Sequence, residues 1–475
     1  MTPINARGSV RLSDSPAMHV SHGYALGVPA DGRRRLAAAW LTLGLAALVG
    51  SGLFAVLLVL SRAPYVKDLI PAADFFRVAL IVHVDLSVLV WFAAMGGMLW
   101  SLNSTGRALA AGWAALWIAV AGTLLMCVAP FTGRGLPVMS NYIPVVDERW
   151  FIGGLLVFAA GCLLLVLRSM LAVPPVGARL DGAGALRFGL NSALVSAALA
   201  LIAFAWSWLR VPGTLEGKAY YEVLFWGGGH VLQFTWTLLM LVAWLWLAEA
   251  IGARLPITPR VATLFFGVGL VSVFATPVIY LAWDIVSMQH YRYLTWIMRF
   301  GGGLAILPFA LAVAVGLATL RGVGDAERPL RAALISSMAL FGAGGIIGFA
   351  IEGSNVKIPA HYHGCIVGVT LALMGLVYHL LPRMGFAAPA ARAAEIQAWL
   401  YGAGQLMHVT GLAWSGGYGV QRKAAGAEQA LRTPEQIAAM GLMGLGGLVA
   451  VIGGLMFLVI AINSMRAGWN SSTSR

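Results

Sequence analysis

The sequence predicts an all-α, polytopic membrane protein whose twelve transmembrane helices form one bundle. Two observations support this fold class. Of the 475 residues, 60% are hydrophobic and only 10% are charged, and the mean hydropathy is +0.84. Apolar runs of about 20 residues recur along the chain, each long enough to cross a hydrocarbon core of roughly 30 Å. A transmembrane β-barrel would instead show alternating segments of about ten residues.

The chain divides into a polar N-terminal tail, one membrane domain and a short C-terminal tail. The first tail, 1–35, lacks the apolar core of a cleaved signal peptide, so the first span is expected to remain as an anchor. The membrane domain covers 36–465, and the second tail is 466–475. Short connections join most spans, which are expected at 36–61, 72–101, 108–130, 151–173, 187–210, 221–250, 261–285, 295–320, 330–351, 361–382, 395–416 and 437–465.

Basic residues in the loops predict how the spans are oriented. The N-terminal tail holds Arg7, Arg11 and the cluster Arg33-Arg34-Arg35, which places it in the cytoplasm. An even number of spans returns the C-terminus to the same side. The net charge of +13 is therefore attributed to membrane orientation and not to nucleic-acid binding. We expect a multi-pass protein of a bacterial-type inner membrane with both termini in the cytoplasm.

The three cysteines exclude several classes of site. Cys127, Cys162 and Cys365 all lie within apolar runs, and the chain contains neither a CxxC nor a CxxCH motif. A disulfide framework, a zinc site and a covalently attached c-type heme are therefore not expected on this chain.

Six histidines from five spans are expected at one depth, in the outer half of the membrane: His83, His230, His290, His361, His363 and His408. Ionisable side chains at such depth are costly and usually functional. Neutral imidazole is a common ligand of heme iron and of copper or non-heme iron. A single imidazole in a span can equally form a helix–helix hydrogen bond, and for His408 both interpretations stay open.

Two of these histidines open the tenth span, in the stretch "AHYHG". On a helix, His361 and His363 point about 200° apart because they are two residues apart. They cannot bind the same metal ion. If both are ligands, they serve two different cofactors on opposite faces of one helix.

This motif resembles the catalytic subunit, subunit I, of the heme-copper oxidase superfamily, and the pattern is closest to its nitric oxide reductase branches. "HVDLSVLVWF" in the second span is similar to the low-spin heme segment of that family, and "FWGGGHVLQF" in the sixth to its copper-ligand segment. "QRK" after the eleventh span stands where the family places residues that pair with heme propionates. The resemblance extends from the first span to the twelfth.

The resemblance implies a role for each histidine. His83 and His363 would be the axial ligands of a low-spin heme, and His361 the proximal ligand of a high-spin heme. His230 and His290 would bind the second metal, copper or non-heme iron.

Two further features follow from the resemblance and concern the hemes. Arg422 and Lys423 would hold the heme propionates, since arginine suits bidentate pairing with carboxylates. The two hemes are expected to be b-type.

The sequence departs from the family pattern at the second metal. A single histidine, His290, stands where the family usually has two in succession, so the third ligand or proton donor is left open among Gln289, Tyr291, Glu222, Asp284 and Glu352. A carboxylate would favour iron over copper. Phe234 occupies the usual position of the cross-linked tyrosine of the oxygen reductases, and Tyr280 is interpreted as too far along the chain to replace it.

These departures favour a reductase that couples nitric oxide to nitrous oxide, fed by quinol or by a partner subunit of the cupredoxin or cytochrome c type. The alternative is a cytochrome c oxidase-type subunit that reduces O2 to water. A less favoured alternative is a twelve-span secondary transporter with a histidine proton relay. The glycines of "WGGGH" are interpreted as allowing a porphyrin to approach the helix.

Overall fold

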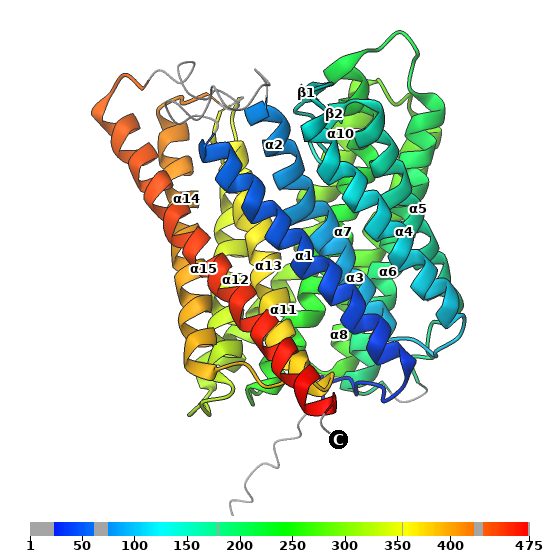
Figure 1. Cartoon of the computed structure of the whole chain (residues 1–475), viewed down its shortest axis with the longest axis vertical. Coiled ribbons are helices and arrows are strands. Elements are labelled where there is room, and N and C mark those ends of the chain that lie inside the picture. The colour runs from blue at the N-terminus through cyan, green and yellow to red at the C-terminus, as the bar shows by residue number, and fades with distance from the viewer. Residues whose placement is uncertain (1–22, 61–74, 178–179, 354, 422–430, 474–475) are drawn as a thin grey trace, which may run out of the picture.

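The computed structural model describes residues 23–60, 75–177, 180–353, 355–421 and 431–473. Within these residues the chain is a bundle of long helices that stand side by side (Figure 1). The predicted fold class, an all-α membrane protein, is confirmed. We call the end of the bundle at which the first helix begins the α1 end, and the opposite end the hairpin end.

The helices are, in chain order, α1 (Gly32–Leu60), α2 (Phe75–Val84), η2 (Asp85–Val90), α3 (Trp91–Leu102), α4 (Leu109–Val128), η3 (Ala129–Thr132), α5 (Arg149–Leu171), α6 (Gly182–Arg210), α7 (Gly217–Ala250), α8 (Pro259–Val273), α9 (Ala275–Ala282), α10 (Met288–Trp296), η4 (Ile297–Gly301), α11 (Gly302–Thr319), α12 (Arg328–Phe349), α13 (Lys357–Arg383), α14 (Ala391–Gly417) and α15 (Pro434–Thr473).

These helices correspond to the expected spans. Eleven helical stretches of the described residues are long and apolar enough to cross a membrane, and α14, with 27 residues, accounts for the twelfth. Two differences concern helix ends. The eighth span begins at Met288 and so includes His290, which was expected in the loop before it. The last helix continues to Thr473, so most of the segment expected as a C-terminal tail is helical.

Small residues bring neighbouring helices into backbone contact. A Cβ atom on Gly122 of α4 would overlap the backbone nitrogen of Phe158 in α5, and one on Gly154 would lie 2.8 Å from the backbone nitrogen of Met126. The same device joins α12 to α13 through Gly364, where a Cβ would lie 2.6 Å from the Cα of Gly344. Such close approach is typical of helix pairs in lipid, where packing replaces the hydrophobic effect as the driving force.

The centre of the bundle is formed by α7 and α13. Of the most apolar window of each helix, 78% is buried in α7 and 89% in α13, against 33–67% for the other candidate spans. These two central helices carry His230, His361 and His363. Three of the six histidines singled out in the sequence therefore lie on the helices that are most shielded from lipid.

A short β-hairpin closes part of one end of the bundle (Figure 1). Its strands, β1 (Leu136–Val138) and β2 (Val145–Asp147), pair antiparallel with Leu136 opposite Asp147 and Val138 opposite Val145. The spans expected at 108–130 and 151–173 leave this segment as a connection between them. The turn between the strands, 139–144, is the part of the hairpin that reaches the candidate site.

The α4–α5 contact provides a test of helix packing. Gly122→Val should destabilise the protein by at least about 1–3 kcal/mol, because the new side chain would overlap backbone atoms of α5. Gly153→Val is the matched control, since a Cβ there meets nothing within 4 Å. Thermal unfolding of the purified protein in detergent measures both. Equal melting temperatures for the two variants would contradict the close contact.

Candidate functional site

His83 is held at the junction of α2 and the π-helix η2. Its Nδ1 lies 2.9 Å from the carbonyl oxygen of Ser51 in α1 and 2.9 Å from the Ser51 hydroxyl, which itself donates to the His83 carbonyl at 3.0 Å. Nδ1–H is therefore the donor to the backbone of α1. This leaves Nε2 without a hydrogen bond among the described residues and available to a ligand.

His361 and His363 are held in the same way but on different sides of α13. Nδ1 of His361 donates to the carbonyl of Gly344 in α12 at 2.7 Å. Nδ1 of His363 donates to the carbonyl of Pro359, one turn earlier, at 2.9 Å. His361 therefore lies toward α12, while His363 lies toward α14 and interacts electrostatically with His83. The arrangement agrees with the expectation of two imidazoles directed to two separate cofactors.

His230 and His290 form the third group and are almost completely buried, at 2% and 1% exposure. Nδ1 of His230 donates to the Trp226 carbonyl at 2.7 Å, so its Nε2 accepts the hydroxyl proton of Tyr142 at 3.0 Å. Nδ1 of His290 has no hydrogen-bond partner within the described residues. The two imidazoles interact electrostatically. An orphaned buried nitrogen beside a second imidazole is a donor set that a metal ion would satisfy.

Four of these histidines thus share one design, in which a backbone carbonyl accepts from Nδ1. That hydrogen bond fixes the tautomer and the ring orientation, and it presents Nε2 to the interior of the site. The side chains of His83, His361 and His363 therefore fit axial ligation of two hemes. His230 and His290 supply two nitrogen donors for a metal ion. A metal ion in such a site usually takes at least three protein ligands, so these two residues fit only part of a metal site.

The candidates for a third ligand fall into two groups. Gln289, Asp284 and Glu352 are exposed. Glu222 and Tyr291 are half-buried. Asp284, although exposed, interacts electrostatically with His290. The Glu222 carboxylate accepts from the backbone N–H and the side-chain amide of Asn141, at 3.1 and 2.8 Å.

The Tyr291 ring packs on Trp226 at 4.7 Å between centroids. Within the described ranges, no group of three or more His, Cys, Asp or Glu side chains could hold a metal ion. A third protein donor at this position must therefore come from another residue type or from a carboxylate that moves.

Tyr142 was missed by the sequence analysis, although it is a direct neighbour of His230. It comes from the turn of the hairpin, and its φ of +61° is uncommon for a residue with a side chain. Its ring lies 4.9 Å from the His230 ring between centroids. The strained backbone and the contact with a candidate ligand are the features expected of a residue held in place for function.

The triple glycine of "WGGGH" provides the space for this contact. A Cβ on Gly229 would overlap the Tyr142 ring, one on Gly228 the Phe204 ring, and one on Gly227 the Tyr280 hydroxyl. The interpretation that these glycines admit a porphyrin is therefore wrong. They admit three aromatic side chains, and three adjacent glycines before a candidate ligand were the available sequence signal.

Tyr280 is a second residue whose position the sequence analysis misjudged. Its ring contacts the His290 ring edge-on at 4.7 Å between centroids, and Ser207 lies 2.7 Å from its hydroxyl. The expectation that Tyr280 lies too far along the chain to reach the site is wrong. The break between α8 and α9 and the loop before α10 bring it back beside His290.

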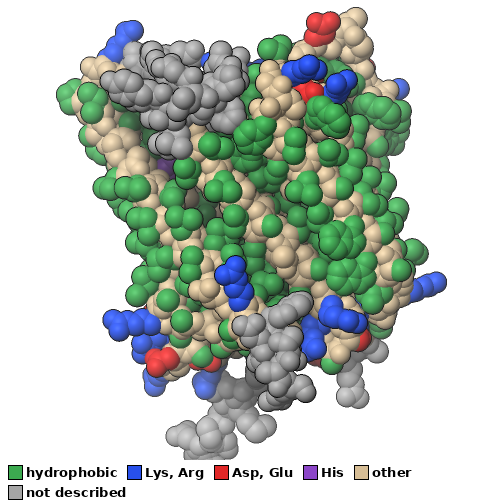
Figure 2. Space-filling view, viewed as in Figure 1, with side chains coloured by type: hydrophobic (Ala, Val, Ile, Leu, Met, Phe, Trp, Pro, Cys, Tyr) green, Lys and Arg blue, Asp and Glu red, His purple; other side chains and the backbone are tan. Residues whose placement is uncertain are grey.

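His408 lies beside His363 and makes a helix–helix hydrogen bond. Its Nδ1 donates to the Met443 carbonyl of α15 at 3.0 Å, and its ring is 5.1 Å from the His363 ring between centroids. Arg422 and Lys423, the predicted propionate partners, lie outside the described residues. Figure 2 shows a histidine at the bottom of a hollow on one face of the molecule, near the hairpin end.

The chain is similar to known proteins over most of its length. An uncharacterized protein of Rickettsia prowazekii (strain Madrid E) is 28% identical over 90% of this chain and 96% of its own length. Cytochrome c oxidase subunit 1 of Thermus thermophilus is 26% identical, over 88% of this chain and 82% of that protein. A heme-copper terminal oxidase solved as a dimer by cryo-EM has the same fold, with a TM-score of 0.73 at 17% identity over 92% of this chain and 84% of that one.

The superfamily predicted from the histidine motifs is confirmed. The family described as cytochrome c and quinol oxidase polypeptide I matches residues 35–465, which is nearly the whole membrane domain. The chain therefore belongs to the cytochrome c and quinol oxidase polypeptide I family and is a catalytic subunit of the terminal oxidase and reductase type.

Proposed function

We propose that the protein reduces nitric oxide to nitrous oxide as the catalytic subunit of a respiratory complex of the inner membrane. The observation that carries this proposal is the identity of the residue that follows His230 by one turn on α7. Phe234 stands one turn along α7, is buried, and packs with Val231 and Val273. An apolar ring at this position supplies neither the proton nor the electron that a phenol would supply to O2 cleavage.

The polar groups that approach His230 lie toward the hairpin end. The Tyr142 hydroxyl and the Asn141–Glu222 pair belong to the hairpin turn and the first turns of α7. In the other half of α7, every side chain from Leu238 to Ala248 is apolar or aromatic. Glu249, near the end of the helix, is the carboxylate of this half. A site that takes its protons from the hairpin side does not need a pumping route through the α1 end, which supports a non-pumping reductase.

Each residue has a defined role in this proposal. His83 and His363 would hold the low-spin heme, His361 the high-spin heme, and His230 and His290 the second metal, copper or iron. When bound, these groups carry the electrons and bind the gas. The protein orients the imidazoles through the Nδ1 hydrogen bonds, and the Tyr142 hydroxyl would give up Nε2 of His230 to the second metal. Arg422 and Lys423 would pair with the propionates, and electrons would arrive from quinol or from a cupredoxin or cytochrome c subunit.

A second candidate, reduction of O2 to water, is favoured by two phenols beside the site. Tyr142 contacts His230, and Tyr280 contacts His290. Either could take the place of the phenol that is absent at Phe234. The Tyr280 hydroxyl, however, lies 2.7 Å from that of Ser207 and donates to the Ala203 carbonyl at 3.2 Å, so its proton is already engaged. We therefore rank this candidate second.

The two candidates are separated by turnover on each gas. The purified complex, supplied with a reduced electron donor, should form N2O from NO and consume O2 at a rate at least about tenfold lower. Gas electrodes and mass detection of N2O measure both reactions on one preparation. Fast O2 consumption with no N2O formed would exclude the proposed reaction and support the second candidate.

The proposed high-spin heme ligand is tested through the glycine that faces its ring. A Cβ on Gly348 would lie 2.7 Å from ring atoms of His361, so Gly348→Val should displace the imidazole. The pyridine hemochrome spectrum should then show about one heme per chain instead of two. Gly345→Val on the same helix meets nothing within 4 Å and should keep both hemes. Two hemes with an unchanged spectrum in Gly348→Val would exclude His361 as the ligand.

Tyr142 is tested by removing its hydroxyl alone. Tyr142→Phe keeps the ring against Gly229 but leaves Nε2 of His230 without its donor. A metal ion bound to Nε2 of His230 would have to displace this hydrogen bond, which is worth about 0.5–1.5 kcal/mol. Its removal should therefore raise the apparent affinity for the second metal by about 2–10-fold, measured as metal content per heme at limiting metal. Tyr220→Phe at the same end of α7 is the control. Wild-type metal content in Tyr142→Phe would show that the hydrogen bond has no role in the site.

A further inference from the structure

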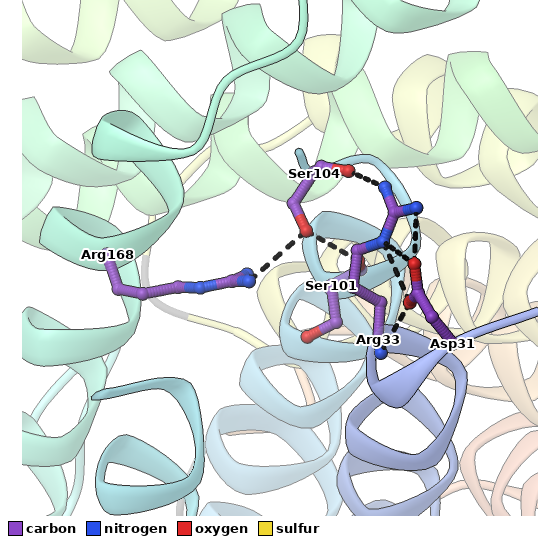
Figure 3. Close-up of polar contacts among 5 residues, drawn as sticks. All are labelled: Asp31, Arg33, Ser101, Ser104 and Arg168. Atoms are coloured by element: carbon purple, nitrogen blue, oxygen red, sulfur yellow. Dashed lines mark hydrogen bonds and ion pairs between the residues drawn. The ribbon is translucent and has the colours of Figure 1, made fainter. Parts of the chain in front are cut away.

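A buried arginine near the α1 end has no counter-ion among the described residues. Arg168, in the last turn of α5, is 1% exposed. Its Nη2 donates to the hydroxyl of Ser104 at 3.3 Å, and Nε and Nη1 have no hydrogen-bond partner within the described residues (Figure 3). A buried guanidinium carries five donors and a full charge, and leaving it unpaired is costly. Something outside the described chain is therefore needed to satisfy it.

Asp31, the carboxylate drawn with Arg168 in Figure 3, is already paired with another arginine. Asp31, just before α1, accepts from Arg33 through Nε at 3.0 and 3.1 Å and through Nη2 at 2.8 Å. The hydrogen bonds from Arg33 hold the pKa of Asp31 at about 2, below its usual value, so this carboxylate is ionised and fully committed at neutral pH. Arg33 also donates to the Ser104 carbonyl and interacts electrostatically with Arg168. Arg33 thus occupies this carboxylate, and Arg168 makes no hydrogen bond to it.

The first turn of α4 adds to the positive potential around Arg168. A Cβ on Gly112, in this turn, would lie 3.5 Å from Nε of Arg168. The helix begins after Ala108, which has a φ of +52° and caps the helix with no side-chain hydrogen bond. The exposed N–H groups and the dipole of a helix N-terminus attract anions. The unpartnered guanidinium therefore lies against a second group that favours negative charge.

Two hydroxyls of the same region are also unpartnered. Ser101 in α3 is 0% exposed and Ser169 in α5 is 3% exposed, and neither Oγ has a hydrogen-bond partner within the described residues. Ser104 donates to the Ser101 carbonyl at 2.9 Å, which ties the loop after α3 to this cluster. The groups without hydrogen-bond partners here are thus N–H donors of an arginine and the hydroxyls of two serines. Together these donors suit an oxyanion.

We propose that Arg168, Ser104 and the first turn of α4 form a binding site for a phosphate-class oxyanion at the α1 end of the bundle. Four helix ends meet there: the beginnings of α1 and α4 and the ends of α3 and α5. Helix ends of a membrane bundle lie at the level of the lipid headgroups. Lys and Arg side chains also gather at this end of the molecule (Figure 2). The phosphate belongs either to a lipid headgroup or to free inorganic phosphate.

The ligand is tested first on the wild-type complex. After exhaustive detergent washing, total phosphorus is measured per heme, and thermal unfolding is followed with sodium phosphate or sodium chloride at matched ionic strength. Retention of about one phosphorus per chain identifies a lipid phosphate. A melting temperature that rises by at least about 2 °C in phosphate but not in chloride identifies an inorganic phosphate site. If neither result is observed, the proposal is overturned.

The location of the site is tested with Arg168→Met, which keeps the bulk of the side chain and removes its donors. This variant should lose the bound phosphorus or the phosphate-dependent shift in melting temperature. Arg328→Met, at the α1 end and exposed, removes a cation that is already paired with Asp325 at 3.2 Å and should keep both. Wild-type ligand retention in Arg168→Met, or a higher melting temperature than wild type in both salts, would overturn the proposal. Ser104→Ala gives a milder second variant, expected to weaken binding, if Arg168→Met does not fold.

Discussion

The site depends on one repeated interaction, a backbone carbonyl that accepts a hydrogen bond from Nδ1 of an imidazole. His83 uses the carbonyl of Ser51, His361 that of Gly344 and His363 that of Pro359. A carbonyl on a packed helix does not move when a side chain changes rotamer, so each ring keeps one tautomer and one direction. Two of these acceptors lie on a neighbouring helix, and the positions of the ligands are therefore set by helix packing.

Glycine makes that packing close enough. Gly344 lets α12 and α13 approach until a Cβ would lie 2.6 Å from the nitrogen of Cys365, and its own carbonyl is the acceptor for His361. On α7, Gly229 instead admits the ring of Tyr142, which completes the surroundings of His230. In a membrane, where helices gain little from burying apolar surface against one another, such contacts supply both stability and precision.

Charge is distributed unequally between the two ends of the molecule. At the hairpin end, buried imidazole nitrogens face a phenol or another imidazole, as Nε2 of His230 faces the Tyr142 hydroxyl. At the α1 end, Arg168 is buried with no carboxylate partner in the described part of the chain, where Asp31 pairs with Arg33. Both situations are costly for an empty protein in a low-dielectric environment. A bound metal ion would resolve the first situation, and the proposed oxyanion would resolve the second.

The sequence by itself determined the spans to within a few residues and the histidines of the site, because hydrophobic length and helical periodicity are local properties. It also determined that His361 and His363 diverge, which follows from 3.6 residues per turn. Only the tertiary structure decided that Tyr142 meets His230 across 88 residues, that Tyr280 returns to His290, and that Arg168 is buried. These contacts depend on a hairpin, a helix break and the meeting of four helix ends, and no local pattern encodes the relative positions of such segments.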